Sequence, residues 1–278
     1  MHAIRLLPLA LLLAAGGTAA ASDCRHSAPR DLQLDLAGVE RLVIELGRHE
    51  LVLTGVPGSS GRISGKACAT DAALLPHLDI EQQREGSTLR LRAAHVAERH
   101  TTTVLFGSHY EYLVLQAEVP QTLPVELQVG SGDARVDNLA ALELGIGSGD
   151  VEIGRIDGPL SLQVGSGDVV AADVGALRVD SIGSGDASIR RVRGAAEVGS
   201  VGSGDLALRA VDGDVRIGSI GSGDVALHEV RGSVTLRSLG SGDLVARDVG
   251  GNLTVERSGS GDIRHSGVSG TVTLPRKR

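Results

Sequence analysis

The tetrad Gly-Ser-Gly-Asp occurs eight times in the second half of the chain, at spacings of 17 to 19 residues. The copies begin at Gly130, Gly147, Gly165, Gly183, Gly202, Gly221, Gly240 and Gly259. A motif that returns at a near-constant short spacing is typical of a solenoid, in which each repeat is one structural unit and neighbouring units stack. This repeat constrains the fold more than any other feature of the sequence.

Within each repeat, apolar residues alternate with polar or small ones in two short runs. After the tetrad at Gly221, Val225 and Leu227 belong to one run, and Val234 and Leu236 to the other. Period-two alternation predicts short strands with one set of side chains pointing inward. Each coil should therefore have two turns, one at the tetrad and one at a second glycine: Gly158, Gly175, Gly194, Gly213, Gly232, Gly251 or Gly270.

Equivalent positions keep their inward character from one repeat to the next. The ninth residue after each tetrad start is Leu139, Ile156, Val174, Val192, Val211, Val230, Val249 or Val268. Stacked branched side chains at a strand spacing of ~4.8 Å can fill a narrow core without aromatic rings. We predict an all-β fold, a single-stranded parallel β-helix with 18–19 residues per coil, and expect it to be right-handed from the general bias of parallel crossovers.

The first half of the chain predicts two further segments. Residues 1–21 combine Arg5, an apolar run and small residues, which is typical of a secretory signal peptide, and no later run is long enough to span a bilayer. Residues 22–125 alternate without the tetrad and should form a less regular β region that caps the solenoid of 126–278. A short helical turn after Asp71 is the one helical expectation.

The two cysteines, Cys24 and Cys68, both follow the predicted signal peptide. In an oxidising compartment they are expected to form one structural disulfide, since neither a metal site nor a redox pair fits two isolated thiols. The net charge is −7, and removal of Arg5 with residues 1–21 makes it −8. An acidic chain disfavours nucleic acid as a partner.

All three aromatic residues, Phe106, Tyr110 and Tyr112, lie within seven positions, close to His109. One interpretation is a hairpin whose rings cover the edge of the core. Another is a partner-binding loop formed by Phe106, His109, Tyr110 and Tyr112. A metal site that uses the nearby histidines with Glu98 and Glu111 is less well supported, because the spacing is not that of metal ligands.

The aspartates of the tetrads allow three interpretations. Glycine can adopt positive φ and removes side-chain crowding, and aspartate can accept backbone N–H bonds, so the tetrad can be a structural corner. Stacking would also align a column that calcium could stabilise, formed by Asp133, Asp150, Asp168, Asp186, Asp205, Asp224, Asp243 and Asp262. Catalysis by clustered carboxylates is the third, although equivalent aspartates give no pair with separated pKa values.

The last repeat departs from the pattern, because His265 stands where Leu227 stands two coils earlier. We expect the core to open to solvent there. Pro275 and the basic residues 276–278 should cap the end against edge-to-edge growth, and a contact of this tail with an anionic surface is the alternative.

A signal peptide, an alternating N-terminal region and blocks such as Ser-Ile-Gly-Ser-Gly-Asp-Val at residues 219–225 resemble the bacterial putative-adhesin family. This is a domain of unknown function similar to the head domain of putative auto-transporter adhesins, and the likeness runs from Leu32 to Leu274. The resemblance implies a parallel β-helix in the cell envelope and no enzymatic activity.

Together these observations predict a non-catalytic, exported protein of the periplasm or cell surface, without a cofactor. It would act as an adhesin-like or scaffold protein toward an envelope component, and it would be a monomer. A self-assembling structural β-helix and a calcium-stabilised repeat protein are the alternatives.

Overall fold

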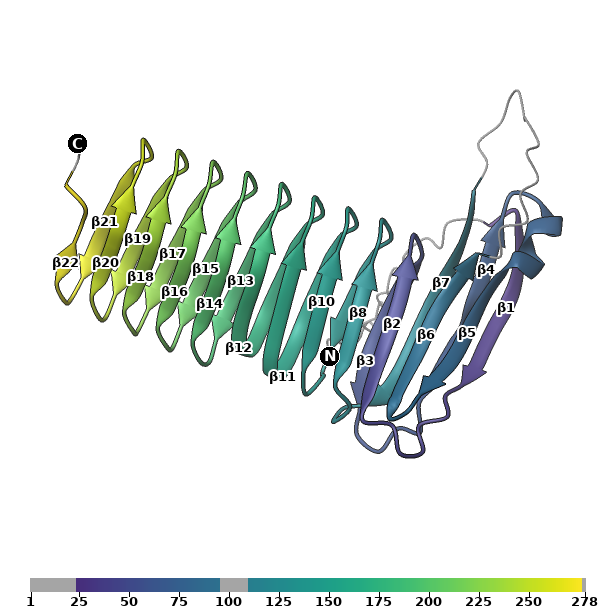
Figure 1. The fold of residues 1–278 in the computed structure, drawn as a ribbon. Helices are drawn as coiled ribbons and strands as arrows, with labels where there is room; N and C mark the ends of the chain where they lie inside the picture. The colour runs from purple at the N-terminus through teal and green to yellow at the C-terminus, as the bar shows by residue number, and fades with distance from the viewer. Residues whose placement is uncertain (1–23, 96–109, 277–278) are drawn as a thin grey trace, which may run out of the picture.

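The computed structural model describes residues 24–95 and 110–276 (Figure 1). These form an almost entirely β structure, a parallel β-solenoid of about 8 turns with about 19 residues per turn, which confirms the predicted fold class. The predicted signal peptide lies outside the described residues. No helix among the described residues is long and apolar enough to cross a membrane.

Each coil contributes one strand to each of two sheets. Sheet I contains β9 (Ala134–Asp137), β13 (Ala187–Val192), β15 (Leu206–Val211), β17 (Val225–Val230), β19 (Leu244–Val249) and β21 (Ile263–Val268). Sheet II contains β8 (Val125–Val129), β10 (Leu142–Ile146), β14 (Ala196–Val201), β16 (Val215–Ile220), β18 (Val234–Leu239), β20 (Leu253–Ser258) and β22 (Val272–Thr273). The long strands β11 (Val151–Val164) and β12 (Val169–Ile182) run through both sheets.

Parallel pairing in register places equivalent residues of successive coils directly above one another. Val225 pairs with Leu206 on one side and with Leu244 on the other. The predicted inward columns are buried from β9 to β19, whereas Ile263 and Val268 of β21 are only partly buried and His265 is exposed. The core therefore opens to solvent at the last coil, as the sequence predicts.

The tetrad forms the turn that enters sheet I, but positive φ is not the reason for its glycines. None of the tetrad glycines has a positive φ. A Cβ on Gly223 would lie only 1.9 Å from the carbonyl oxygen of Gly204 in the preceding coil, and the second glycine of every other tetrad is similarly crowded. The expectation of positive backbone dihedrals is wrong here, and that of relief from crowding is confirmed.

Left-handed backbone occurs instead at the far end of sheet I, at the residue before the buried ninth position. Arg191, Ala210, Glu229 and Asp248 have φ between 56° and 62°, and Gly267 occupies the same place with φ 65°. This conformation is uncommon for residues other than glycine, asparagine and aspartate. It lies near the end of these strands of sheet I, just before the second turn.

The N-terminal region contains β1 (His26–Gln33), β2 (Arg41–Gly47), β3 (Glu50–Val56), β4 (Arg62–Ala69), the 3₁₀ helix η1 (Ala72–His77), β5 (Leu78–Glu85), β6 (Thr88–His95) and β7 (Glu111–Pro120). Strands β2 and β3 pair parallel with β8 and β9, so they extend the two sheets by one coil without a tetrad. Beyond them, β4 pairs antiparallel with β1 and β7, and β5 with β6. Asp71 caps η1 by accepting the N–H of Ala73, which confirms the predicted helical turn.

The predicted disulfide between Cys24 and Cys68 is present, with a Cα–Cα distance of 5.3 Å. Cys68 is fully buried on β4. The bond therefore fixes the start of the described chain to the region beyond the first coil.

Candidate functional site

The outer face of sheet I carries its exposed side chains in columns, because equivalent residues stack from coil to coil. We call it the striped face. The acidic column continues the eight tetrad aspartates with Glu50 at its N-terminal end. Two residues further along each strand runs the central column: Val52, Arg135, Glu152, Val170, Ser188, Ala207, Ala226, Val245 and Arg264.

The first seven tetrad aspartates bond to the next coil rather than to their own turn. Oδ1 of Asp205 accepts the backbone N–H of Asp224 at 2.8 Å, and the same contact joins every neighbouring pair from Asp133 to Asp262, at 2.8–3.3 Å. The predicted role as a backbone acceptor is confirmed, with the partner one coil away. One carboxylate oxygen of each of these seven aspartates is thus engaged within the solenoid.

The N-terminal half of the striped face is hollowed into a groove of about 720 Å³. Its outward-facing lining, which we call the acidic groove, consists of Glu50, Val52, Val114, Asp133, Arg135, Asp150, Glu152, Asp168 and Val170. Val52 and Val170 are 43% and 46% exposed, and they are two of the three large apolar side chains exposed in the described chain. Exposed apolar surface rimmed by polar groups is typical of an interaction site.

The charge of this groove is strongly negative. Five carboxylates line it, and Arg135, its single cation, donates from Nε to Glu152 at 3.1 Å. Carboxylates stacked about 4.8 Å apart repel one another, and a cationic partner would reduce that repulsion. The groove is therefore suited to a basic partner with an apolar part.

The C-terminal half of the striped face has a different character. Here the central column is small or apolar, from Ser188 to Val245. Beyond it, a further two residues along each strand, lies a basic column of Arg190, Arg209, His228 and Arg247. The face thus changes from an acidic groove to acidic and basic stripes separated by a flat strip of small residues.

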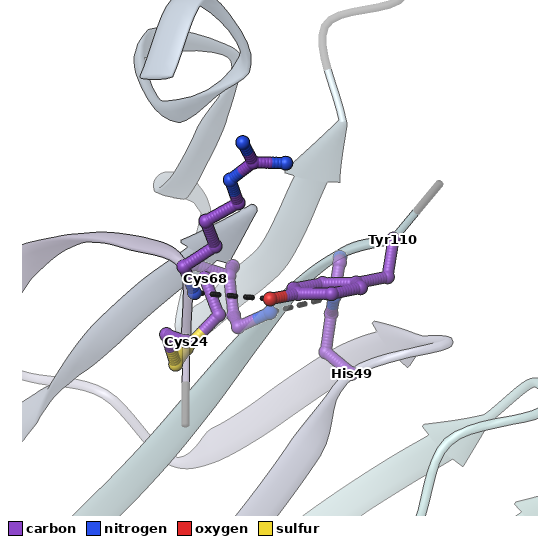
Figure 2. The surroundings of a disulfide bond; sticks show 6 residues. Cys24, His49, Cys68 and Tyr110 are labelled. Atoms are coloured by element: carbon purple, nitrogen blue, oxygen red, sulfur yellow. Dashed lines mark hydrogen bonds between the residues drawn. A yellow bond between two sulfur atoms is a disulfide. The ribbon is translucent and has the colours of Figure 1, made fainter. Parts of the chain in front are cut away.

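The aromatic cluster lies near the disulfide (Figure 2), and Tyr110 and Tyr112 also line a pocket with Glu50 and Asp133 at the N-terminal end of the acidic column. Tyr110 and Tyr112 are partly buried with ring centroids 5.9 Å apart, and the hydroxyl of Tyr110 accepts the N–H of Arg25 at 3.0 Å. Behind them the buried His49 accepts the N–H of Leu113 on Nδ1 at 3.1 Å. Phe106 and His109 lie outside the described residues, so the partner-binding hypothesis for this cluster stays a prediction.

Perturbed titrations in the described chain belong to ion pairs that favour the charged forms. The hydrogen bond from Arg92, assisted by Arg90, lowers the pKa of Glu45, and the one from Arg155 lowers the pKa of Asp157. The hydrogen bond to Glu126 raises the pKa of Arg41. In each case the ion pair stabilises the charged form of the group. An acid–base catalyst instead needs a pKa moved toward neutrality.

Metal binding has no preformed site among residues 24–95 and 110–276, where no group of three or more histidine, cysteine, aspartate or glutamate side chains is arranged to hold an ion. The calcium hypothesis for the aspartate column stays a prediction with its own test below.

The acidic groove is not predicted by the inward columns, because its lining side chains point outward. The outward residues Glu152 and Val170 can be found by applying the same comparison to the fifth residue after each tetrad start, whereas Val52 follows no tetrad and is placed by the pairing of β3 with β9. Val114 could not, because its place beside the groove depends on the pairing of β7 with β3 across a long stretch of sequence.

No protein-family model matches the chain, and no curated protein matches it either. Among solved structures, it is similar to a putative lipid binding protein from Parabacteroides distasonis, with a TM-score of 0.46 and 16% identity over 89% of this chain and 97% of that one. A putative adhesin from Bacteroides fragilis gives a TM-score of 0.39 and 16% identity, over 87% and 97%. A putative cell adhesion protein from Clostridium sporogenes gives a TM-score of 0.35 and 13% identity, over 91% and 100%.

Proposed function

We propose that the protein is a non-catalytic binding protein of the cell envelope, adhesin-like in the sense that an extended outer face holds the partner. The acidic groove carries this proposal. Its two exposed valines supply apolar contact, and the surrounding carboxylates supply attraction for a basic surface.

Export to an oxidising compartment is part of the same proposal. The Cys24–Cys68 disulfide supports it, because structural disulfides persist in secreted and periplasmic proteins and are rare in the cytosol.

Retention of the purified protein on envelope material from intact cells tests the proposal. We expect Val52→Lys/Val170→Lys to lose retention, because both side chains are exposed and the change places two cations in the groove without altering the core. Thr235→Lys/Thr254→Lys adds the same charge on the outer face of sheet II and should leave retention intact. Equal retention of all three proteins, or none by the wild type, would refute a role for the groove.

End-to-end assembly is a second candidate, favoured by the incompletely buried Ile263 and Val268 at the last coil. The opposite end is covered by antiparallel strands, which works against a continuous filament. Sedimentation should therefore show no oligomer whose size grows steadily with protein concentration.

The calcium alternative has a separate test. A melting temperature that does not respond to chelator or to added calcium would refute it.

A further inference from the structure

The C-terminal half of the striped face has a charge pattern that is complementary to itself. In each of the four coils that begin at Gly183, Gly202, Gly221 and Gly240, an aspartate, a small or apolar residue and a basic residue alternate along the strand of sheet I. Stacking turns these into an acidic stripe, a central strip and a basic stripe, with the two charged stripes ~13 Å apart at ~3.3 Å per residue.

Only one way of placing two such faces together pairs opposite charges. Rotation about a two-fold axis parallel to the solenoid axis keeps every coil at its own level and exchanges the two stripes. Asp186 then faces the partner subunit's Arg190, and Asp243 faces the partner subunit's Arg247. A two-fold axis along the strands would instead reverse the solenoid and bring acidic stripe against acidic stripe, which is unfavourable.

The central strip allows this approach. Ser188 and Ala207 are exposed, Ala226 and Val245 are partly exposed, and all four are short enough for sheets to pack at the usual ~10 Å separation. At either end of the strip, Glu152 and Arg264 would each face its own copy across the axis. The like charges confine the contact to the coils between them.

The charged groups are available for new partners. No ion pair in the described chain involves Arg190, Arg247 or Asp205. Two of the charged groups have surface ion pairs that would have to exchange, Arg209 with Glu229 at 3.2 Å and Asp243 with Arg264 at 3.1 Å. Exposed pairs of this kind contribute little and exchange readily.

We propose that the protein forms a two-fold dimer through this part of the striped face, with the two solenoids parallel and in register. Four coils at ~4.8 Å and about seven residues of strand cover only ~400 Å², compared with the ~800 Å² that each partner buries in a standard stable interface. The dimer is therefore weak, concentration-dependent and sensitive to salt. This inference is independent of the acidic groove.

Sedimentation of the full chain from low micromolar to millimolar concentration tests it. We expect a reversible monomer–dimer equilibrium that Arg190→Glu/Arg247→Glu weakens at least ~10-fold, since both carboxylates would face aspartates. The control Arg237→Glu/Arg257→Glu makes the same charge change on exposed side chains of sheet II, which also lack ion pairs in the described chain, and should leave the equilibrium unchanged. A monomer at every concentration, or equal dimerisation of both variants, would overturn the proposal.

The orientation has a separate readout in single-cysteine variants joined by a short bis-maleimide. No free thiol competes among the described residues. Ser188→Cys and Val245→Cys lie three coils apart on the central strip, and each should link to its own copy. Efficient linking of Ser188→Cys only to Val245→Cys in a mixture would show the reversed arrangement and overturn the proposed axis.

Discussion

In the N-terminal region β4 pairs antiparallel with β1 and β7, and one disulfide closes the structure, whereas from β8 to β22 every pairing is parallel and joins strands one coil apart. The first region depends on contacts that occur once, such as the Arg25–Tyr110 hydrogen bond. The second repeats the same contacts in each coil. A destabilising substitution in the N-terminal region should therefore affect that region alone. One in the solenoid should weaken the contact between adjacent coils.

The largest expected effect is loss of the disulfide. Cys24→Ala/Cys68→Ala should destabilise the N-terminal region by up to about 4 kcal/mol, the chain-entropy value for a loop closed over 44 residues. Hydrogen exchange should show loss of protection in β1 and β4 and unchanged protection in β13 to β19. Equal loss throughout the chain would mean that the two regions unfold as one unit and that the contrast between them is wrong.

A methyl group on a tetrad glycine should give the largest effect within the solenoid. In Gly223→Ala the new Cβ would meet the Gly204 carbonyl oxygen at 1.9 Å, so adjacent coils must separate, at a cost of about 3 kcal/mol. Ser222→Ala, at the exposed neighbouring position, should change the free energy of unfolding by less than about 0.5 kcal/mol. Chemical denaturation of both variants measures the difference, and equal stability would show that the coil contact is not tight.

The part of the fold that can be predicted from the sequence is the repeated coil of the solenoid. Inward columns such as Val211, Val230 and Val249 can be read from the sequence because each coil must bury the same face. The left-handed backbone at Arg191 and Glu229 cannot be read from the sequence, since neither residue favours positive φ.

The expectation of positive φ at the tetrad glycines is wrong for a related physical reason. In an isolated turn, glycine usually indicates positive φ, whereas here its lack of a Cβ matters only once the next coil is stacked on it. The acidic groove has the same origin. Its three aspartates belong to the repeated tetrads and can be read from the sequence, but Glu50 and Glu152 lie outside the tetrads, and its shape depends on Val114 of β7, which sequence periodicity does not place.

Replacing a column aspartate separates its hydrogen bond from its charge. Asp205→Ala removes the acceptor for the Asp224 N–H and should cost about 1 kcal/mol. Asp205→Asn keeps an oxygen at that position and removes one charge from the repelling column, so it should be at least as stable as the wild type at low salt. Thermal unfolding at low and high salt measures both, and an asparagine variant as unstable as the alanine one would contradict the acceptor role.

The residues with left-handed backbone at the end of sheet I allow a smaller, stabilising substitution. Ala210 has φ 56°, so Ala210→Gly should relieve strain and raise the free energy of unfolding by up to about 1 kcal/mol. Ala207→Gly, on the same strand at a position without positive φ, should instead lower it by about 0.5–1 kcal/mol. Opposite signs for two identical substitutions three residues apart would establish the conformation, and equal signs would contradict it.

The smallest effect should come from Glu45 on β2, where the N-terminal region joins the solenoid. Its carboxylate accepts from Arg92 at 2.9 Å and from Arg90 at 2.6 Å, and these contacts lower its pKa in the folded state. A lowered folded-state pKa stabilises the protein above the ordinary glutamate pKa, and the gain is lost as the pH falls through the folded-state value. Glu45→Gln should therefore be less stable than the wild type at neutral pH, by less than about 1 kcal/mol because the pair is partly exposed to solvent, and equally stable in strong acid. A double-mutant cycle with Arg92→Gln isolates the pair, and a coupling energy that does not shrink on acidification would show that it arises from packing and not from charge.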